Sequence, residues 1–316
     1  MQFNHKDLLD LDVLNAGEIT QILDTADSFK EVSERKIKKV PALRGTTVAN
    51  MFFEPSTRTR ISFELAEKRL SADSVNFSKM TSSVVKGESL RDTAENIQAM
   101  KVDIVVMRHS SSGAHRFLSE FLDASIVNAG DGQHAHPTQA LLDMMTLKQR
   151  WGTFEGKRVT IIGDIMHSRV ARSNIWGLTT MGVAVTVCGP PTMMPVDVEK
   201  LGTGSVTVEY DLRKAVEGAD AVNILRIQLE RQKAVLFPST REYFDVFGVT
   251  PAVLDEAPKH CIVMHPGPMN RGVEISQDIA DGDRAVILEQ VTNGVAVRMA
   301  VLFLLAGGKI EESDIR

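Results

Sequence analysis

Short apolar runs alternate with amphipathic stretches along this chain of 316 residues. The runs lie at 46–53, 102–107, 125–128, 158–163, 183–188, 221–225 and 261–265. Between the runs, apolar residues recur at helical spacing, as Ile61, Leu65, Ala66 and Leu70 do. Strands that are apolar throughout and alternate with helices are typical of parallel sheets covered on both faces. The pattern therefore predicts an α/β fold.

The apolar runs fall into two groups, which predicts two domains, each a parallel β-sheet flanked by helices. The sequence QHAHP at 133–137 interrupts the pattern and leads into a predicted helix that extends through Lys148. We place the first domain at 1–135 and the second at 136–290. The segment from Val291 to Leu305 is apolar nearly all round, which predicts a helix buried between other elements.

Composition narrows the classes of function. The chain is 43% hydrophobic and carries 36 basic and 41 acidic residues, a net charge of −5, with no basic stripe interleaved with aromatics. Without such a stripe we expect no nucleic acid as a partner. We also expect no membrane as a partner, since no apolar run reaches the roughly 18 residues of a membrane span. The first residues lack the features of a signal peptide, which favours a cytoplasmic protein. Cys188 and Cys261 lie inside apolar runs and are predicted core thiols, so no metal site is expected.

The sequence FEPSTRTR at 53–60 gathers hydroxyls and guanidiniums at a predicted helix start. The first turn of a helix has unpaired N–H groups and a partial positive charge, and Ser56, Thr57 and Arg58 add donors to them. Arg58 and Arg60 are two residues apart and cannot share one helix face, so one should face an anion and the other a structural partner. Taken alone, an ordinary capped helix with solvated arginines explains this segment equally well.

Other polar residues follow apolar runs. The stretch TIIGDIMHSR at 160–169 lacks two glycines of a dinucleotide-binding turn, so Arg169 is better interpreted as a carboxylate clamp at the edge of the second sheet. A surface ion pair of Arg169 is the alternative. Arg226 and Gln228 follow the run 221–225, and two arginines near one pocket imply a ligand with two negative charges. Arg108 directly follows the run 102–107 and suits a site better than a core.

Five segments in this order resemble the catalytic chains of the aspartate carbamoyltransferases, within the aspartate/ornithine carbamoyltransferase superfamily. They are FEPSTRTR at 53–60, VKGES at 85–89, HPTQALLD at 136–143, RIQLER at 226–231 and HPGP at 265–268. The resemblance extends from the first predicted strand nearly to the last helix. Five ordered motifs are far more specific than any one of them.

The resemblance implies transfer of the carbamoyl group of carbamoyl phosphate to L-aspartate, in de novo pyrimidine (UMP) biosynthesis, without a metal or other cofactor. The implied carbamoyl phosphate ligands are Ser56, Thr57, Arg58, Thr59, Ser82, Arg108, His136, Gln139, Pro266 and Gly267. The implied aspartate ligands are Lys86, Arg169, Arg226, Gln228, Gly267 and Pro268. The implied catalytic residues are Arg58, Thr59, Lys86, Arg108 and His136, of which Thr59, Arg108 and His136 would face the oxygen that becomes negative in the tetrahedral intermediate.

The resemblance also bears on assembly. The polar segment 78–89 has too few apolar residues to pack by itself, and its counterpart in the family reaches a neighbouring subunit's site through a serine and a lysine. A homotrimer with active sites at subunit interfaces is therefore expected, and regulatory or dihydroorotase-type subunits stay open as further partners. The C-terminal helix, at about 291–308, is expected to return to the first domain, as in the family.

Two departures from the ornithine enzymes favour aspartate. Those enzymes carry His-Cys-Leu-Pro where this chain has HPGP at 265–268, and a Ser-Met-Gly loop that is missing after Leu225. Gly267 also replaces a leucine found in other members, and we expect its bond to Pro268 to be cis. Two alternatives stay open: a carbamoyltransferase for another amino acceptor such as ornithine, and a silent anion-binding scaffold subunit.

Overall fold

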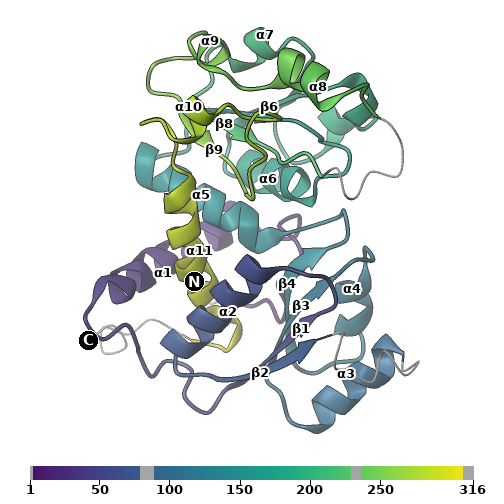
Figure 1. Cartoon of the computed structure of the whole chain (residues 1–316). Helices are drawn as coiled ribbons and strands as arrows, with labels where there is room; N and C mark the ends of the chain where they lie inside the picture. The colour runs from purple at the N-terminus through teal and green to yellow at the C-terminus, as the bar shows by residue number, and fades with distance from the viewer. Residues whose placement is uncertain (1–2, 79–88, 229–235, 309–316) are drawn as a thin grey trace. The chain divides into compact units, whose positions relative to one another are not determined.

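The computed structural model describes residues 3–78, 89–228 and 236–308. The chain forms two compact units: unit 1 comprises Met1–Met145 and Thr292–Arg316, and unit 2 comprises Thr146–Val291. It passes from one unit to the other within helix α5 (Pro137–Trp151) and again within helix α11 (Ile287–Leu305), both labelled in Figure 1. The expected division at residue 136 coincides with the start of α5, whereas the contacts divide the chain inside that helix.

Unit 1 is built on a four-stranded parallel sheet in the order β2-β1-β3-β4. Its strands are β1 (Thr47–Phe52), β2 (Asp73–Ser78), β3 (Ile104–His109) and β4 (Ser125–Asp131), and its helices include α1 (Ala16–Glu34), α2 (Thr57–Arg69), α3 (Leu90–Ala99) and α4 (Ala114–Ser119). Apolar side chains of α3 and α4 pack on one face of the sheet. From α2, the buried Glu67 accepts a hydrogen bond of 2.9 Å from Asn50 of β1.

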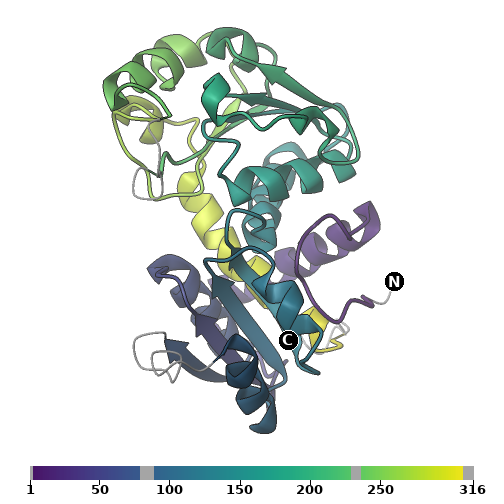
Figure 2. The same ribbon diagram turned by 90° about the vertical axis from the view of Figure 1, so that its right-hand side faces the viewer.

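The C-terminal helix α11 ends in unit 1, as expected from the resemblance. Phe303 of α11 meets Phe29 of α1 edge to face, with ring centroids 5.4 Å apart. By length and composition α11 is apolar enough to cross a membrane, but 67% of its most apolar window is buried, as in the core helix of a soluble protein. The two views in Figure 1 and Figure 2 show this yellow helix beside the purple α1.

Unit 2 contains a five-stranded parallel sheet in the order β7-β6-β5-β8-β9. The strands are β5 (Arg158–Ile162), β6 (Ala184–Cys188), β7 (Val206–Glu209), β8 (Ala221–Ile224) and β9 (Ile262–Met264). The helices are α6 (Arg169–Thr180), α7 (Leu212–Val216), α8 (Thr240–Phe247), α9 (Pro251–Leu254) and α10 (Gln277–Ala280), with two short 3₁₀ turns at Pro191–Met193 and Val198–Lys200. One core cluster joins α7, α8, α9 and α10 to one face of this sheet.

The predicted α/β class is confirmed: both sheets are parallel, and every predicted apolar run overlaps a strand. The sequence analysis missed β2 and β7, each of which is one of the two outer strands of its sheet, whereas the opposite outer strands β4 and β9 have apolar runs. β2 and β7 lie partly in solvent, as the exposed Val75 of β2 shows, so they need no continuous apolar run. Cys188 and Cys261 are buried free thiols, as predicted.

Candidate active site

Each sheet reverses its strand order at one point. In unit 1 the chain leaves β1 for β2 on one side and then for β3 on the other, and in unit 2 it leaves β5 towards β6 and later continues at β8 on the opposite side. In open parallel sheets, ligands bind beyond the carboxyl ends of the two strands that flank such a reversal. The rule points to the segments after β1 and β3 in unit 1 and after β5 and β8 in unit 2, and the segments after the next strands, β4 and β9, reach the same edges.

The segment after β1 leads directly into α2. Ser56 is the N-cap residue in extended conformation, yet its side chain makes no capping hydrogen bond to the helix. Thr57 and Arg58, the first helical residues, are exposed, while Thr59 is buried. Arg60 pairs with Glu64 at 3.6 Å. The start of α2 thus presents N–H groups, hydroxyls and a guanidinium together.

Arg108 lies near the end of β3, the strand beside β1. Its side chain is nearly buried, donates through Nη1 to the carbonyl of Ala129 at 3.2 Å, and forms an ion pair with Glu54, with Nε and Oε2 3.2 Å apart. Because Glu54 follows β1 and Ala129 lies on β4, one guanidinium is tied to three neighbouring strand ends. Glu54 was not predicted as part of this site from the sequence.

A second arginine, Arg298 of α11, contacts residues of α2. Its Nη1 donates to Ser62 Oγ at 3.0 Å, and its guanidinium stacks 5.0 Å from the centre of the Phe63 ring. Burial, together with the positive charge of Arg108, lowers the pKa of Arg298 to about 10, and the carboxylate of Asp143 opposes this shift. Positive charge is therefore concentrated in unit 1, where a bound anion would relieve the repulsion.

His136 and Gln139 lie at the start of α5, after β4. The carbonyl of His136 accepts from the backbone N–H groups of Gln139 and Ala140, and its buried side chain follows the strand end directly. Gln139 Nε2 donates to Asp143 Oδ1 at 2.9 Å, one helical turn further on. The structure therefore brings His136, Gln139, Arg108 and the start of α2 to one edge of the unit 1 sheet.

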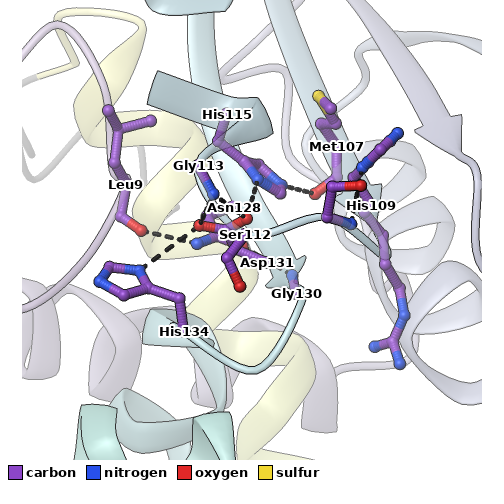
Figure 3. Close-up of polar contacts among 12 residues, drawn as sticks. Leu9, Met107, His109, Ser112, Gly113, His115, Asn128, Gly130, Asp131 and His134 are labelled. Atoms are coloured by element: carbon purple, nitrogen blue, oxygen red, sulfur yellow. Dashed lines mark hydrogen bonds and ion pairs between the residues drawn. The ribbon is translucent and has the colours of Figure 1, made fainter. Parts of the chain in front are cut away.

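Asp131, the last residue of β4, holds this edge together, as Figure 3 shows. Its carboxylate accepts from the Gly113 N–H at 2.9 Å and lies 3.2 Å from His115 Nδ1 and 3.4 Å from His134 Nδ1. His115 Nε2 in turn donates to the carbonyl of Met107 at 2.7 Å. Burial alone would raise the pKa of Asp131, but these hydrogen bonds and the charge of His115 together hold it well below its usual range.

The backbone of Asp131 also connects segments at this edge of the sheet. Its N–H and carbonyl pair with Ala135, directly before His136, and Gly132 N–H donates to the carbonyl of His109, directly after Arg108. Asp131 and His115 were missed by the sequence analysis. A carboxylate three residues after an apolar run was the one available signal, but its partners Gly113 and His115 come from another segment that no local pattern connects to it.

In unit 2, Arg169 is the first residue of α6, in the segment after β5. Ser168 caps this helix, accepting from Ala171 N–H at 3.1 Å, and Asp164 accepts from His167 Nδ1 at 2.9 Å. Arg169 is 5% exposed. Arg226 and Gln228 follow β8, the strand beside β5, and both are half-buried.

The turn after β9 completes the second group. The bond between Gly267 and Pro268 is cis, as predicted, and Gly267 adopts a φ of 60°, in the left-handed region that a leucine would occupy only with strain. Because β5, β8 and β9 are adjacent, Arg169, Arg226, Gln228 and the turn share one edge of the unit 2 sheet. Ser82 and Lys86 lie outside the described residues.

The structure offers little to a metal ion. Within 3–78, 89–228 and 236–308, no group of three or more histidine, cysteine, aspartate or glutamate side chains is placed to hold one. Burial raises the pKa of Cys188 to about 12 and that of Cys261 to about 11, so both thiols stay protonated at neutral pH.

Comparison with known proteins covers nearly the whole chain. The family model "Aspartate/ornithine carbamoyltransferase, carbamoyl-P binding domain" matches residues 6–149, and "Aspartate/ornithine carbamoyltransferase, Asp/Orn binding domain" matches residues 155–305. The aspartate carbamoyltransferase catalytic subunit of Gemmatimonas aurantiaca is 60% identical over 309 residues, which cover 98% of this chain and 96% of that protein.

Solved structures of carbamoyltransferases are similar to this chain in fold. The aspartate transcarbamoylase of Trypanosoma cruzi, in complex with carbamoyl aspartate and phosphate, has a TM-score of 0.83 and 28% identity, and 94% of each chain is covered. The ornithine carbamoyltransferase of Thermus thermophilus has a TM-score of 0.85 and 27% identity, and 96% of this chain and 99% of that one are covered. The fold is thus common to both kinds of enzyme, and the chain belongs to the aspartate/ornithine carbamoyltransferase family.

Proposed function

We propose that this chain transfers the carbamoyl group of carbamoyl phosphate to the amino group of L-aspartate, giving N-carbamoyl-L-aspartate and phosphate. The observation that carries the proposal is the presence of arginines at the strand-order reversal of each sheet: Arg58 and Arg108 in unit 1, Arg169 and Arg226 in unit 2. Two separate cationic groups suit two anionic substrates. Relatives about 60% identical carry the name of this enzyme.

In this proposal, carbamoyl phosphate binds first to unit 1. The start of α2 holds the phosphate through Ser56, Thr57, Arg58 and Thr59, because N–H groups, hydroxyls and a guanidinium all donate there. Thr59, Arg108 and His136 donate to the carbonyl oxygen, which becomes negative as the tetrahedral intermediate forms. The carbamoyl amide is held by Gln139 and by the carbonyls of Pro266 and Gly267.

Aspartate binds to unit 2. Arg169, Arg226 and Gln228 hold its two carboxylates, and the turn at Gly267 and Pro268 holds the amino group. The ammonium of ornithine would be repelled by the two guanidiniums, so they favour aspartate. The amino nitrogen then forms a bond to the carbonyl carbon, the bond from that carbon to the phosphate oxygen breaks, and the departing phosphate takes the proton. Most of the acceleration comes from holding the reactants in position.

The assembly follows from the family resemblance. Ser82 and Lys86 reach the active site of a neighbouring subunit in a homotrimer, Lys86 contacts both substrates, and the enzyme acts in the cytoplasm in de novo pyrimidine synthesis.

The proposal is tested by supplying the purified chain with carbamoyl phosphate labelled in its carbonyl carbon and a panel of amines that includes aspartate and ornithine. We expect label in carbamoyl aspartate alone. Transfer mainly to ornithine would assign the chain to the other branch of the family, and transfer to no amine would favour the silent scaffold.

A further inference from the structure

Glu274 is a fully buried carboxylate with no part in the proposed chemistry. It lies between β9 and α10, is 0% exposed, and accepts hydrogen bonds from two separate stretches of unit 2. Its Oε1 accepts from His265 Nε2 at 3.2 Å and from the backbone N–H of Asn270, and its Oε2 accepts from the Asn270 side chain at 3.2 Å and from the backbone N–H of Ile227 at 3.4 Å. Four donors thus compensate the burial of one negative charge.

The hydrogen bonds of His265 fix its protonation at each ring nitrogen. The backbone N–H of Gly267 donates to His265 Nδ1 at 2.8 Å, so that nitrogen carries a lone pair. The proton is therefore on Nε2, where it points to Glu274. His265 N–H itself donates to Gln290 Oε1 at 3.0 Å. A chain of bonds thus runs from the Glu274 carboxylate through the imidazole to the backbone of Gly267.

Asn270 connects the same two stretches a second time. Its Nδ2 donates to the carbonyl of Ile227 at 2.9 Å as well as to Glu274. Ile227 is fully buried between Arg226 and Gln228, so the hydrogen bonds at its N–H and carbonyl set the backbone from which both side chains extend. The segment after β8 and the turn after β9 are therefore tied to one carboxylate.

We propose that Glu274 is a positioning residue for the second substrate: it fixes the Arg226–Gln228 segment and the turn at Gly267 and Pro268 in one mutual geometry. The inference rests on the proposed function, because it takes those residues as the aspartate ligands. An apolar side chain would fill the same space without burying a charge, but it would leave the N–H groups of Ile227 and Asn270 without an acceptor. Small displacements of binding groups cost large factors in rate, which gives such a residue its effect.

The test compares Glu274→Gln and Asn270→Ala with the control Glu256→Gln. Glutamine keeps the shape of Glu274 but turns one acceptor into a donor that faces other donors. Asn270→Ala removes hydrogen bonds without unpairing a charge, so it is the milder variant. Glu256 pairs with Arg213 at 2.7 Å on the surface of the same unit. For each variant we would measure kcat, the KM for aspartate and the Kd for carbamoyl phosphate alone.

We expect Glu274→Gln to raise the KM for aspartate about ten-fold or more and to lower kcat, with Asn270→Ala changing both in the same direction by a smaller factor. The Kd for carbamoyl phosphate should stay within about two-fold of wild type, because its principal ligands belong to unit 1. Glu256→Gln should match wild type. If Glu274→Gln does not fold, Asn270→Ala decides the matter alone.

The outcomes separate the inference from the proposed function. An unchanged KM for aspartate in the folded variants, with a wild type that carbamoylates aspartate, would overturn the inference and leave the function intact. An equal loss of carbamoyl phosphate affinity would also overturn it, by showing a general loss of structure. A wild type that does not carbamoylate aspartate would overturn the function and the inference together.

Discussion

Charged side chains at the strand ends differ in what their surroundings already supply. Arg108 has Glu54 and a backbone carbonyl as partners, and Asp131 has Gly113, His115 and His134. Such groups are held in place before any substrate arrives, which reduces the entropy lost on binding. Arg108 and Asp131 are also buried, whereas Arg58 lies on the exposed first turn of α2. Substitutions at these two kinds of position should therefore differ in their effects on stability and on binding.

A substitution of Arg226 tests the proposed aspartate ligands. Arg226→Ala should raise the KM for aspartate and lower kcat, at a total cost of about 3 kcal/mol in kcat/KM, because a bidentate contact to a carboxylate is lost. Affinity for carbamoyl phosphate, measured by calorimetry, should stay nearly unchanged. Arg213→Ala, which breaks an exposed ion pair with Glu256 in the same unit, is the matched control and should have little effect. Equal weakening of both substrates would count against the assignment.

Asp131 should stabilise the fold in a pH-dependent manner. Its folded-state pKa is depressed, so its stabilising contribution is complete above the unfolded pKa of about 4 and is lost as the pH falls through the folded value. Asp131→Asn should lower the free energy of unfolding near pH 7 by about 3 kcal/mol, since it breaks a buried ion pair.

The gap in unfolding free energy between wild type and Asp131→Asn should narrow by about 1 kcal/mol between pH 5 and pH 3. Urea unfolding followed by circular dichroism would measure it. A gap of the same size at both pH values would show that the carboxylate of Asp131 is not the origin of the stability.

At the residue scale, sequence reasoning found the side chains that directly follow apolar runs, such as Arg108 and Arg226, because strand ends in parallel sheets gather at one edge. It missed Glu54, Asp131 and Glu274. Their functions depend on hydrogen bonds and ion pairs to residues in other segments, such as Arg108, His115 and Ile227, and a single carboxylate in the sequence carries no sign of such partners.

At the scale of the elements, helices α2 and α8 each have a serine at the N-cap, and these two serines differ in their hydrogen bonds. Ser239 caps α8 by accepting from Glu242 N–H at 3.1 Å, whereas Ser56 occupies the N-cap of α2 without such a bond. A serine hydroxyl that accepts from a backbone N–H of the first turn contributes to the stability of the helix. A serine hydroxyl that makes no such bond is available to a ligand.

The two serines give a paired prediction. Ser239→Ala should cost about 1 kcal/mol of unfolding free energy and leave carbamoyl phosphate binding unchanged. Ser56→Ala should change stability by less than about 0.5 kcal/mol but weaken carbamoyl phosphate about ten-fold, since a hydrogen bond to a charged ligand is lost. Urea unfolding and calorimetry would measure the two quantities. A loss of stability in Ser56→Ala, with unchanged binding, would assign Ser56 to the helix alone.

The elements themselves were largely predictable, with the exception of β2 and β7. Interior strands such as β3 and β5 are buried on both faces and have a continuous apolar sequence. β2 and β7 are outer strands that lie partly in solvent, so their own residues form no continuous apolar run, as the polar sequence of β2 illustrates.

At the scale of the whole molecule, the proposed shared active site can be tested without a structure of the assembly. Arg58→Ala and Lys86→Ala homotrimers should each be nearly inactive. After the two are dissociated, mixed and reassociated, about three-quarters of the trimers are hybrids, and each hybrid has one site with an intact Arg58 and a neighbour's intact Lys86. Roughly a quarter of wild-type activity should return. Hybrids that form but stay inactive would show that Lys86 acts within its own chain.

The central claim of this account is that each unit supplies the principal ligands of one substrate at the carboxyl edge of its own sheet. Amide hydrogen exchange tests it most directly, because N–H groups in loops and in first helical turns exchange rapidly until a ligand covers them. Carbamoyl phosphate alone should slow exchange at 53–60 in unit 1. A stable analogue that joins a phosphonate to a dicarboxylate should also slow exchange at 164–169 and 225–228 in unit 2. Equal protection of these unit 2 segments by carbamoyl phosphate alone would contradict the account.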